Sequence, residues 1–457
     1  MPSENILLRR LGLKEATALV IGTVIGTGVF LKATKMSQVT GSPLWVILAW
    51  IVAGLLSLAG ALCYAELGGL YPQAGGEYVY LREAYGEMAG FLYGWMRFWI
   101  GTPGSIAAYG VGAATFLGGI FQVNPEASSW MKNLAAIAMI TGFSSLNTIS
   151  VIVGGRLAAF MTALKIAMIL GLTTALFLAS KGSSWSHLQE VSGSGGWCGF
   201  SAFGTAMLAA LWAYDGWNNM PMAAGEIKDP GKNIPRGLIY GMTTVLVIYV
   251  AINLSYFYVL PFSEVLSSYS SASPSAMPVA TKAASLAFGS VAVVLLSSAF
   301  VFSALGSMNG SILTGARIPF AMARDGLFFH QLGRVTKKSR TPWVAILAQG
   351  AVASALALSG TFDQLTDYVV FASWIFYAMV TASIFVFRKR NPNAERPYRT
   401  PGYPMLPAVF LAASVLLLIN TVISTPRESL IGLAFIISGI PVYFIFRRKQ
   451  KQSLART

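Results

Sequence analysis

The chain has 457 residues, a formal net charge of +15 and a mean hydropathy of +0.63. Hydrophobic residues make up 55% of it and charged residues 11%, whereas about a quarter of an ordinary soluble chain is charged. This composition excludes a soluble protein, because too little polar surface is available to keep a chain of this size dispersed. The sequence therefore predicts an integral membrane protein.

Apolar runs of bilayer-crossing length recur along the whole chain. About 20 helical residues span the hydrocarbon core, whereas β-barrel spans are shorter and alternate. We expect an all-α protein, a single transporter domain over 1–457 with 12 transmembrane helices. The third and eighth runs are long enough to require tilt or an extension beyond the lipid. The runs cover about 11–36, 43–70, 88–120, 130–150, 155–180, 200–224, 236–260, 279–316, 342–358, 364–388, 403–423 and 429–446.

The first run follows Arg9 and Arg10, but it is too long for a signal peptide and lacks a small-x-small cleavage site, so we expect it to be retained. Its centre reads GTVIGTGVF, from Gly22 to Phe30. Glycine disfavours a helix interior by about 1 kcal/mol relative to alanine, so this helix is predicted to break at mid-membrane. Gly22 and Gly26 alone also fit the small-xxx-small pattern of helix packing, and this alternative stays open.

The fifth run contains a lysine, Lys165, in the stretch RLAAFMTALKIAMILGL from Arg156 to Leu172. At 1.5 Å per helical residue it lies about 13 Å deep, close to the midplane of a ~30 Å core. A lysine at that depth costs about 2.5–3.5 kcal/mol on insertion scales. We therefore expect it to face the bundle interior and the carbonyl groups of the first-span break. The alternative is a side chain that snorkels to the interface.

A second interrupted helix is expected in the sixth run, which reads ALWAYDGWNNM from Ala210 to Met220. Breaks at corresponding positions of two halves are the best sequence indication of a transporter binding site. The two runs are five apart, and an odd number of helices per repeat inverts the second repeat. The sequence therefore predicts a leucine-transporter-like 5+5 inverted repeat, over 11–180 and 200–388, followed by two C-terminal helices over 403–447.

The two breaks together suit a zwitterion. Unwound backbone at mid-membrane is tolerated where it lines a wet cavity, and its free groups can bind a solute. The half-helix that begins near Thr27 offers N–H donors and a positive dipole end to a carboxylate. The carbonyl groups near Val24, Trp212 and Ala213 can accept from an ammonium group.

The positive charge orients the protein in the membrane. With the N-terminus in the cytoplasm and 12 alternating spans, 24 of the 32 Lys and Arg residues fall on the cytoplasmic side and six on the outer side. This positive-inside bias predicts a multi-pass protein of the cell (inner or plasma) membrane with both termini cytoplasmic. The basic residues are therefore not expected to recruit nucleic acid.

Several motifs resemble one known family. GTVIGTGVF and YAELGGLYPQAGGEYVYLREAYG (Tyr64–Gly86) resemble the amino acid–polyamine–organocation superfamily. WAYDGWNNMPMAAGEIKDPGKNIPRGL (Trp212–Leu238) is similar to the L-amino-acid transporter branch, close to bacterial serine/threonine exchangers. GARIPFAMARDGLFF (Gly315–Phe329) and ERPYRTPGYP (Glu395–Pro404) resemble cytoplasmic links of that branch. The resemblance covers nearly the whole chain.

The resemblance implies a substrate site at the two breaks. Thr27 and Gly28 would bind the substrate carboxylate, and Trp212 would act as an aromatic gate. Phe376 would lie near the substrate side chain, and Lys165 would lie where sodium-coupled relatives of the fold hold a cation. The expected substrate-binding residues are Val24, Ile25, Gly26, Thr27, Gly28, Trp212, Ala213, Asp215 and Phe376.

The resemblance also implies a sodium-independent secondary transporter of L-amino acids. We expect an exchanger of small neutral ones, such as serine, threonine and alanine, that works by alternating access. Proton coupling, and cationic or large neutral substrates, stay open. Asp215 stands where relatives for large neutral substrates have glycine and suggests cationic substrates, although serine/threonine exchangers carry Asp there too. The alternative for Asp215 is a packing role with a partner such as Arg97.

Other function classes fit the sequence less well. No enzyme is expected, because the two histidines, His187 and His330, fall in predicted loops and no catalytic motif is present. A channel or a membrane sensor is a further alternative, but channels use rings of charges or carbonyls from repeated loops. Cys63 and Cys198 show no metal-ligand spacing, so no cofactor and no metal are expected.

The expected partners are a small-molecule L-amino acid and the lipid bilayer. Animal members of the branch pair with a single-span glycoprotein through a cysteine in the outer loop between the third and fourth spans. The corresponding loop, QVNPEASSW from Gln122 to Trp130, contains no cysteine. No disulfide-linked heavy subunit is therefore expected, and a monomer is consistent with the sequence.

Overall fold

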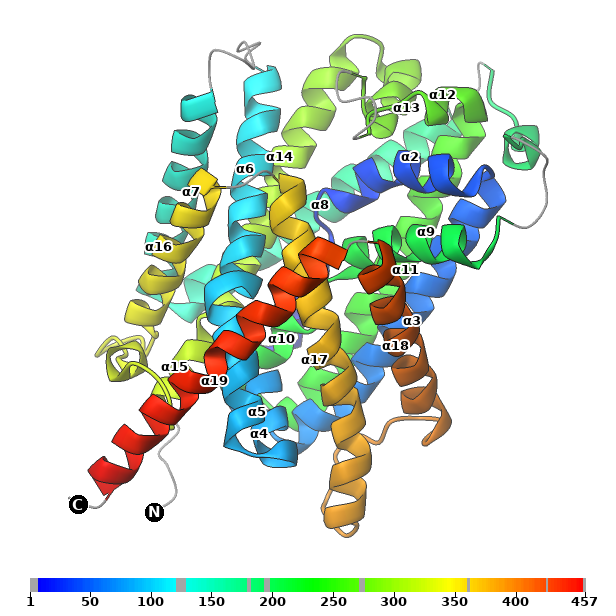
Figure 1. Ribbon diagram of the computed structural model, residues 1–457. Coiled ribbons are helices and arrows are strands. Elements are labelled where there is room, and N and C mark those ends of the chain that lie inside the picture. The colour runs from blue at the N-terminus through cyan, green and yellow to red at the C-terminus, as the bar shows by residue number, and fades with distance from the viewer. Residues whose placement is uncertain are drawn as a thin grey trace.

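The computed structural model describes residues 7–120, 129–178, 182–192, 198–270, 276–359, 362–424 and 426–454. These residues form a bundle of helices, and β structure among them is confined to isolated bridges, such as the parallel one between Leu11 and Ile227 (Figure 1). The high helix content follows from the apolar runs, because a backbone in lipid must satisfy its hydrogen bonds within each segment.

The helices follow one another through short links. The first half of the chain contains α1 (Leu13–Val24), α2 (Gly28–Thr40), α3 (Pro43–Leu70), α4 (Glu77–Tyr85), α5 (Glu87–Met96), the π-helical turn η1 (Arg97–Gly101), α6 (Thr102–Ile120), α7 (Ser129–Ile149) and α8 (Val151–Leu178). A 3₁₀ turn, η2 (Trp185–Gln189), leads to the second half. That half contains α9 (Phe200–Tyr214), α10 (Asn219–Met222), the 3₁₀ turn η3 (Ala224–Glu226), α11 (Pro230–Val259), α12 (Phe262–Leu266), α13 (Val279–Phe288), α14 (Val291–Gly315), α15 (Arg317–Arg324), the 3₁₀ turn η4 (His330–Gly333), α16 (Trp343–Ser359), α17 (Phe362–Arg390), α18 (Met405–Ser424) and α19 (Pro426–Leu454).

Many of these helices are long and apolar enough to cross a membrane. Within the described residues, eight stretches meet that condition: Leu13–Thr40, Pro43–Leu70, Val151–Leu178, Pro230–Val259, Val291–Arg324, Phe371–Arg390, Met405–Ile423 and Ser429–Gln452. Shorter apolar helices cover Phe200–Tyr214, Val279–Phe288 and Trp343–Leu358. The chain is therefore a multi-pass membrane protein, while the count of 12 spans and the inverted repeat stay predictions.

The first predicted break is present. The helix α1 ends at Val24 and α2 begins at Gly28, so residues 25–27 are unwound. Gly28 is required by close packing, because a Cβ atom there would lie 2.8 Å from the Cβ atom of Ala213 on α9. The α1 segment is held at the centre of the bundle, where it contacts α8, α11 and α14.

The second predicted break is present as well, and it touches the first. The helix α9 ends at Tyr214, and the chain resumes as α10 at Asn219. Gly216 between them has φ 115°, and a Cβ atom there would lie 2.8 Å from the backbone oxygen of Thr23. The Thr23 hydroxyl donates to the Gly216 carbonyl at 2.9 Å. The two interruptions are thus packed directly against each other.

The long third and eighth runs are each subdivided. The third becomes α5, η1 and α6 without a loop, because its middle turn is π-helical. The eighth, expected over 279–316, is two helices: α13 ends at Phe288, and Gly289 has φ 57°, a left-handed conformation that interrupts the helix before α14. Only α14 therefore has the length of a span.

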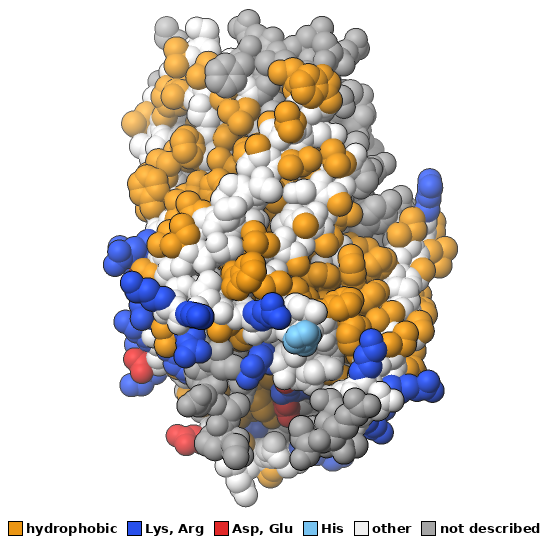
Figure 2. Space-filling view, turned by 90° about the vertical axis from the view of Figure 1, so that its left-hand side faces the viewer, with side chains coloured by type: hydrophobic (Ala, Val, Ile, Leu, Met, Phe, Trp, Pro, Cys, Tyr) orange, Lys and Arg blue, Asp and Glu red, His pale blue; other side chains and the backbone are white. Residues whose placement is uncertain are grey.

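The surface matches a membrane environment. Large apolar side chains are highly exposed, among them Phe160 at 65%, Leu416 at 67% and Ile423 at 74%, which soluble monomers avoid over large contiguous areas. Figure 2 shows a broad hydrophobic face, with most of the Lys and Arg side chains in view gathered toward its lower end. This separation is the one expected between a lipid-facing band and a basic membrane interface.

Candidate functional site

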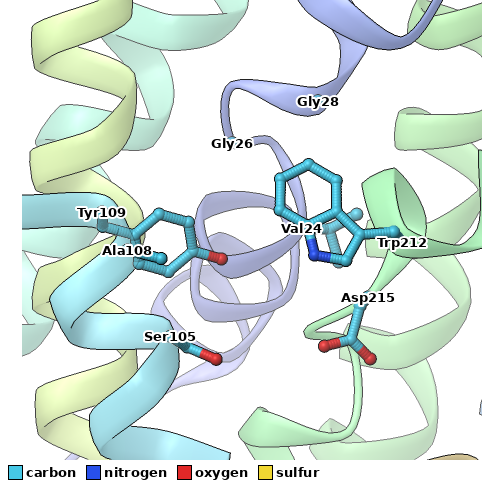
Figure 3. Close-up of a pocket in the computed structure, with 8 residues that line it drawn as sticks. All are labelled: Val24, Gly26, Gly28, Ser105, Ala108, Tyr109, Trp212 and Asp215. Atoms are coloured by element: carbon cyan, nitrogen blue, oxygen red, sulfur yellow. The ribbon is translucent and has the colours of Figure 1, made fainter. Parts of the chain in front are cut away.

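A small cavity lies between the two broken helices and α6. In Figure 3, Ser105 and Tyr109 of α6 lie across it from Trp212 and Asp215, and the α1–α2 break closes a further side. Its free volume is about 20 Å³, which is room for about one water molecule. The conformation is therefore closed around a space smaller than an amino acid. The lining residues are Val24, Gly26, Gly28, Ser105, Ala108, Tyr109, Trp212 and Asp215.

Five residues expected from the sequence line this cavity: Val24, Gly26, Gly28, Trp212 and Asp215. Ile25, Thr27 and Ala213 belong to the same breaks but are not part of the lining. Phe376 also stays outside it, and its ring packs edge-on against Tyr93 at a centroid distance of 5.3 Å. The residue of α17 that reaches the breaks is the next one, Tyr377.

The donor side of the site is the start of α2. Thr27 is the N-cap residue and is 1% exposed, and its hydroxyl has no hydrogen-bond partner among the described residues. The first N–H groups of a helix have no intrahelical acceptor and carry the positive end of its dipole. A buried, unpartnered hydroxyl beside such groups can donate to a carboxylate oxygen.

The acceptor side consists of carbonyl groups that one tyrosine links. The Tyr249 hydroxyl, on α11, lies 3.0 Å from the Val24 oxygen and 3.0 Å from the Ala213 oxygen. A phenol has a single proton to donate, and each carbonyl has two lone pairs. Both carbonyls therefore keep capacity to accept from an ammonium group. Sequence reasoning missed Tyr249, which the sequence presents as one of several tyrosines in an apolar helix.

Lys165 lies behind the first break. It is fully buried on α8, and its ammonium nitrogen lies 2.7 Å from the Gly22 oxygen and 2.6 Å from the Ile25 oxygen. The Ser307 hydroxyl, on α14, accepts from the same nitrogen at 2.9 Å. The side chain thus faces the break and not the interface, so snorkelling does not describe it.

Two serines of α14 support the same carbonyls. Ser307 donates toward the Gly22 and Ile25 oxygens at 3.0 and 3.1 Å, and Ser303 lies 3.1 Å from the Ile25 and Gly26 oxygens. Sequence reasoning missed both, although their spacing of four places them on one helix face. Together with Lys165 they occupy the end of α1, where the helix leaves its carbonyl groups without intrahelical donors.

The acid of the second break is held by a tyrosine. The Tyr377 hydroxyl donates to Asp215 Oδ1 at 2.6 Å. Arg97 instead donates to Asn219 Oδ1 at 2.9 Å, and it forms no ion pair with Asp215 within the described residues. The Arg97–Asp215 pairing considered above is therefore absent in this conformation, and the Asp215 carboxylate lines the cavity.

A further buried acid fastens the second break from the side of α4. Glu77 is fully buried, and it accepts from Asn218 Nδ2 at 3.1 Å and from the Tyr64 hydroxyl at 2.7 Å. The Tyr93 hydroxyl donates to the same carboxylate oxygen as Asn218. The polar residues of the sixth span are thus each tied to a different element, which positions the break in the bundle.

The remaining expectations concern cofactors and partners. Within the described residues, no group of three or more His, Cys, Asp or Glu side chains could hold a metal ion. Cys63 is a buried free thiol, and Cys198 is a partly exposed one. Most of the loop from Gln122 to Trp130, namely residues 122–128, lies outside the described part of the chain. The expectations of no cofactor and no disulfide-linked subunit therefore stay predictions.

Comparison with known proteins agrees with this geometry. Residues 11–446 match the family model described as amino acid permease. The chain is 32% identical to the serine/threonine exchanger SteT of Bacillus subtilis (strain 168), over 98% of this chain and 99% of that protein.

More distant relatives extend the same pattern. The chain is 30% identical to the human b(0,+)-type amino acid transporter 1, over 97% of this chain and 89% of the relative. It is 27% identical to the human cystine/glutamate transporter, over 96% of this chain and 85% of that protein. The resemblance to amino acid transporters of the L-amino-acid branch, inferred from the motifs, is confirmed.

Proposed function

Because the chain belongs to the amino acid permease family, we propose that it is a sodium-independent exchanger of small neutral L-amino acids such as serine, threonine and alanine. The observation that carries the proposal is the contact between two broken helices, one offering donors at Thr27 and both offering acceptors at Val24 and Ala213. Every L-α-amino acid presents the matching carboxylate and ammonium groups.

Substrate would bind by its backbone groups at the two breaks. The carboxylate would accept from the first turn of α2 and the Thr27 hydroxyl, and the ammonium would donate to the Val24 and Ala213 carbonyls. The substrate side chain would then point toward Ser105 and Ala108 on α6. These two side chains are small and one of them is polar, which suits the short side chains of serine, threonine and alanine.

Sodium independence is supported by Lys165. A sodium ion bound at the end of α1 would need the Gly22 and Ile25 oxygens as ligands, since hard cations take oxygen donors. The Lys165 ammonium already donates to both oxygens, at 2.7 and 2.6 Å. A fixed ammonium group can supply the positive charge that an ion would otherwise bring.

The exchange mode is supported by similarity to a relative that carries the name exchanger, SteT. The two interruptions support alternating access, because α2, α9 and α10 would move at the unwound joints while α8 and α14 hold the end of α1. The orientation with cytoplasmic termini remains part of the proposal and rests on the distribution of Lys and Arg.

A second candidate is a transporter of cationic or large neutral amino acids. The observation that favours it is Asp215, whose carboxylate lines the cavity and has a tyrosine, not a cation, as its partner. A substrate guanidinium or ammonium group would pair with such a carboxylate. Similarity to the b(0,+)-type amino acid transporter 1 keeps this candidate in view.

Competition in proteoliposomes separates the two candidates. Uptake of labelled L-serine would be measured in the presence of excess unlabelled L-serine, L-threonine, L-alanine, L-leucine, L-arginine or L-lysine, with D-serine as the stereochemical control. We expect serine, threonine and alanine to suppress uptake and arginine and lysine to leave it unchanged. Strong competition by arginine or lysine, with none from serine or alanine, would overturn the proposal.

A further inference from the structure

A second, larger hollow lies far from the two breaks, at the end of α19. Its volume is about 550 Å³, within the range of small-ligand sites. One wall is the last part of α19, with Phe446 and Lys449, and the other runs from the end of α15 to the start of η4, with Arg324, Phe329 and His330. Gln450 joins the walls, because its side-chain nitrogen donates to the Asp325 backbone oxygen at 2.6 Å.

The hollow carries uncompensated positive charge. Arg324 and Lys449 are exposed and form no ion pair with any described residue. The one acid of the lining, Asp325, is already paired, because it forms an ion pair with Arg82, which it shares with Glu83, and accepts from the Tyr78 hydroxyl at 2.6 Å. A ligand in this hollow therefore meets two free cations and no free anion.

The hollow also lies where α19 changes from apolar to basic residues. The last turns of α19 change from VYFIF, which ends at Phe446, to RRKQK, which begins at Arg447, and the lining includes residues on both sides of that change. The lining itself contains apolar surface, because Phe329 is 50% exposed and Phe446 is half-buried. In Figure 1 this end of α19 projects beyond the helices around it, next to α15.

We propose that this hollow binds an anionic phospholipid. The phosphate would lie between Arg324 and Lys449, and the acyl chains would cover the Phe329 and Phe446 side chains that line the hollow. Basic pockets of this kind at a membrane surface bind anionic headgroups. A soluble phosphate would satisfy the cations but would leave the aromatic side chains in water, so the combination favours a lipid.

The test is a lipid titration of the full-length protein in detergent, followed by native mass spectrometry. Phosphatidylglycerol and phosphatidylcholine with the same acyl chains would be compared. We expect phosphatidylglycerol to bind at least about tenfold more tightly. The double variant R324A/K449A should raise the dissociation constant for phosphatidylglycerol about thirtyfold, because each of the two lost cations should weaken lipid binding about fivefold.

Matched variants and soluble probes complete the design. Lys337 and Lys338 lie in the same link and are exposed, but they do not line the hollow, so K337A/K338A should bind like the unmodified protein. R324K/K449R keeps the charge and should retain binding. Equal affinity for the two lipids, or unchanged binding by R324A/K449A, would contradict the site. Displacement of the lipid by millimolar inorganic phosphate would contradict a lipid as its ligand.

Discussion

Trp212 is the largest side chain that lines the cavity between the breaks. Its ring lies against Gly28, where a Cβ atom would come within 2.9 Å of it, and the Lys32 ammonium lies 4.5 Å from its centroid. Because it closes one side of the site, Trp212→Ala should open the cavity to water. We expect initial uptake rates in proteoliposomes to fall at least about tenfold, since precise positioning and water exclusion are lost.

Two control variants separate a site defect from a folding defect. Trp212→Phe keeps an aromatic ring and should retain most of the activity. Trp343, on α16, is 38% exposed and does not line the cavity, so Trp343→Ala should transport normally. Unchanged kinetics in a well-expressed Trp212→Ala protein would show that the ring does not gate the site.

Tyr249 has a role that can be isolated by removing one oxygen. Tyr249→Phe leaves the ring but removes the donor to the Val24 and Ala213 carbonyls. We expect a stability loss of about 1–3 kcal/mol, the penalty for buried acceptors that lose their partner, together with a higher Michaelis constant for serine. Thermal unfolding in detergent and uptake kinetics measure the two effects.

The same helix provides a matched control. Tyr256 is also fully buried, but its hydroxyl has no hydrogen-bond partner among the described residues. Tyr256→Phe should therefore leave stability unchanged or raise it. Equal thermal stability of Tyr249→Phe and Tyr256→Phe would show that the Tyr249 hydroxyl contacts with Val24 and Ala213 do not stabilise the protein.

For single residues, the sequence predicts how deep a side chain lies in the membrane better than it predicts the direction in which the side chain points. The depth of Lys165 follows from the helical rise and its inward direction from the cost of a lysine in lipid, and the structure places its nitrogen beside the first break. Tyr249 and Tyr377 could not be assigned, because nothing along the chain distinguishes their inward-facing hydroxyls from those of neighbouring tyrosines. The family resemblance pointed to Phe376 and not to Tyr377. The two residues are adjacent, and a shift of one residue turns a helix by about 100°, so a resemblance in sequence does not fix which of them faces the site.

At the scale of the elements, a buried ion pair fixes the turn η3, which follows the second break and α10. We call this ion pair the clamp. Arg317, at the start of α15, makes two bonds to Glu226 of η3, at 2.7 and 2.9 Å, and both side chains are 1% exposed. The Glu226 backbone oxygen accepts from the Arg10 and Leu11 amides at 2.8 and 2.9 Å. The pair therefore connects the chain before α1, the end of the sixth span and α15.

Breaking one side of this pair should be severe. Arg317→Met leaves the Glu226 carboxylate buried without its cation and should destabilise the protein by about 3–5 kcal/mol, measured as a fall in the thermal midpoint in detergent. The double variant Arg317→Met/Glu226→Leu removes both charges and should recover much of that loss. A double variant at least as unstable as Arg317→Met would contradict this account of the clamp.

The two helix breaks could be predicted from the sequence, whereas the end of α13 and the π-helical turn η1 could not. Glycines at Gly26 and Gly28 in one span, and Asp215 with Gly216 in another, are sequence features that weaken a helix locally. Gly289 ends α13 by the same chemistry, but a single glycine in an apolar run is usually tolerated, so the eighth run was expected as one helix. The π-helical turn at Arg97–Gly101 has no comparable signal in the sequence.

For the whole molecule, composition alone determined the class. A charged fraction of 11% predicts a membrane protein, and the large apolar side chains exposed on the surface are consistent with that class. The packing of α6 across the cavity from the breaks could not be derived, because spans distant in sequence meet there only through the three-dimensional arrangement. Ser105, Ala108 and Tyr109 were missed for that reason.

The central claim is that an ammonium group, not a sodium ion, holds the end of α1 in an amino acid exchanger. Its most direct test is uptake of labelled L-serine into proteoliposomes, in sodium or choline medium, with and without unlabelled L-serine inside. We predict equal initial rates in the two media, acceleration by internal serine, and loss of most activity in a correctly folded Lys165→Ala protein. A steep sodium dependence of uptake by the unmodified protein would contradict the claim.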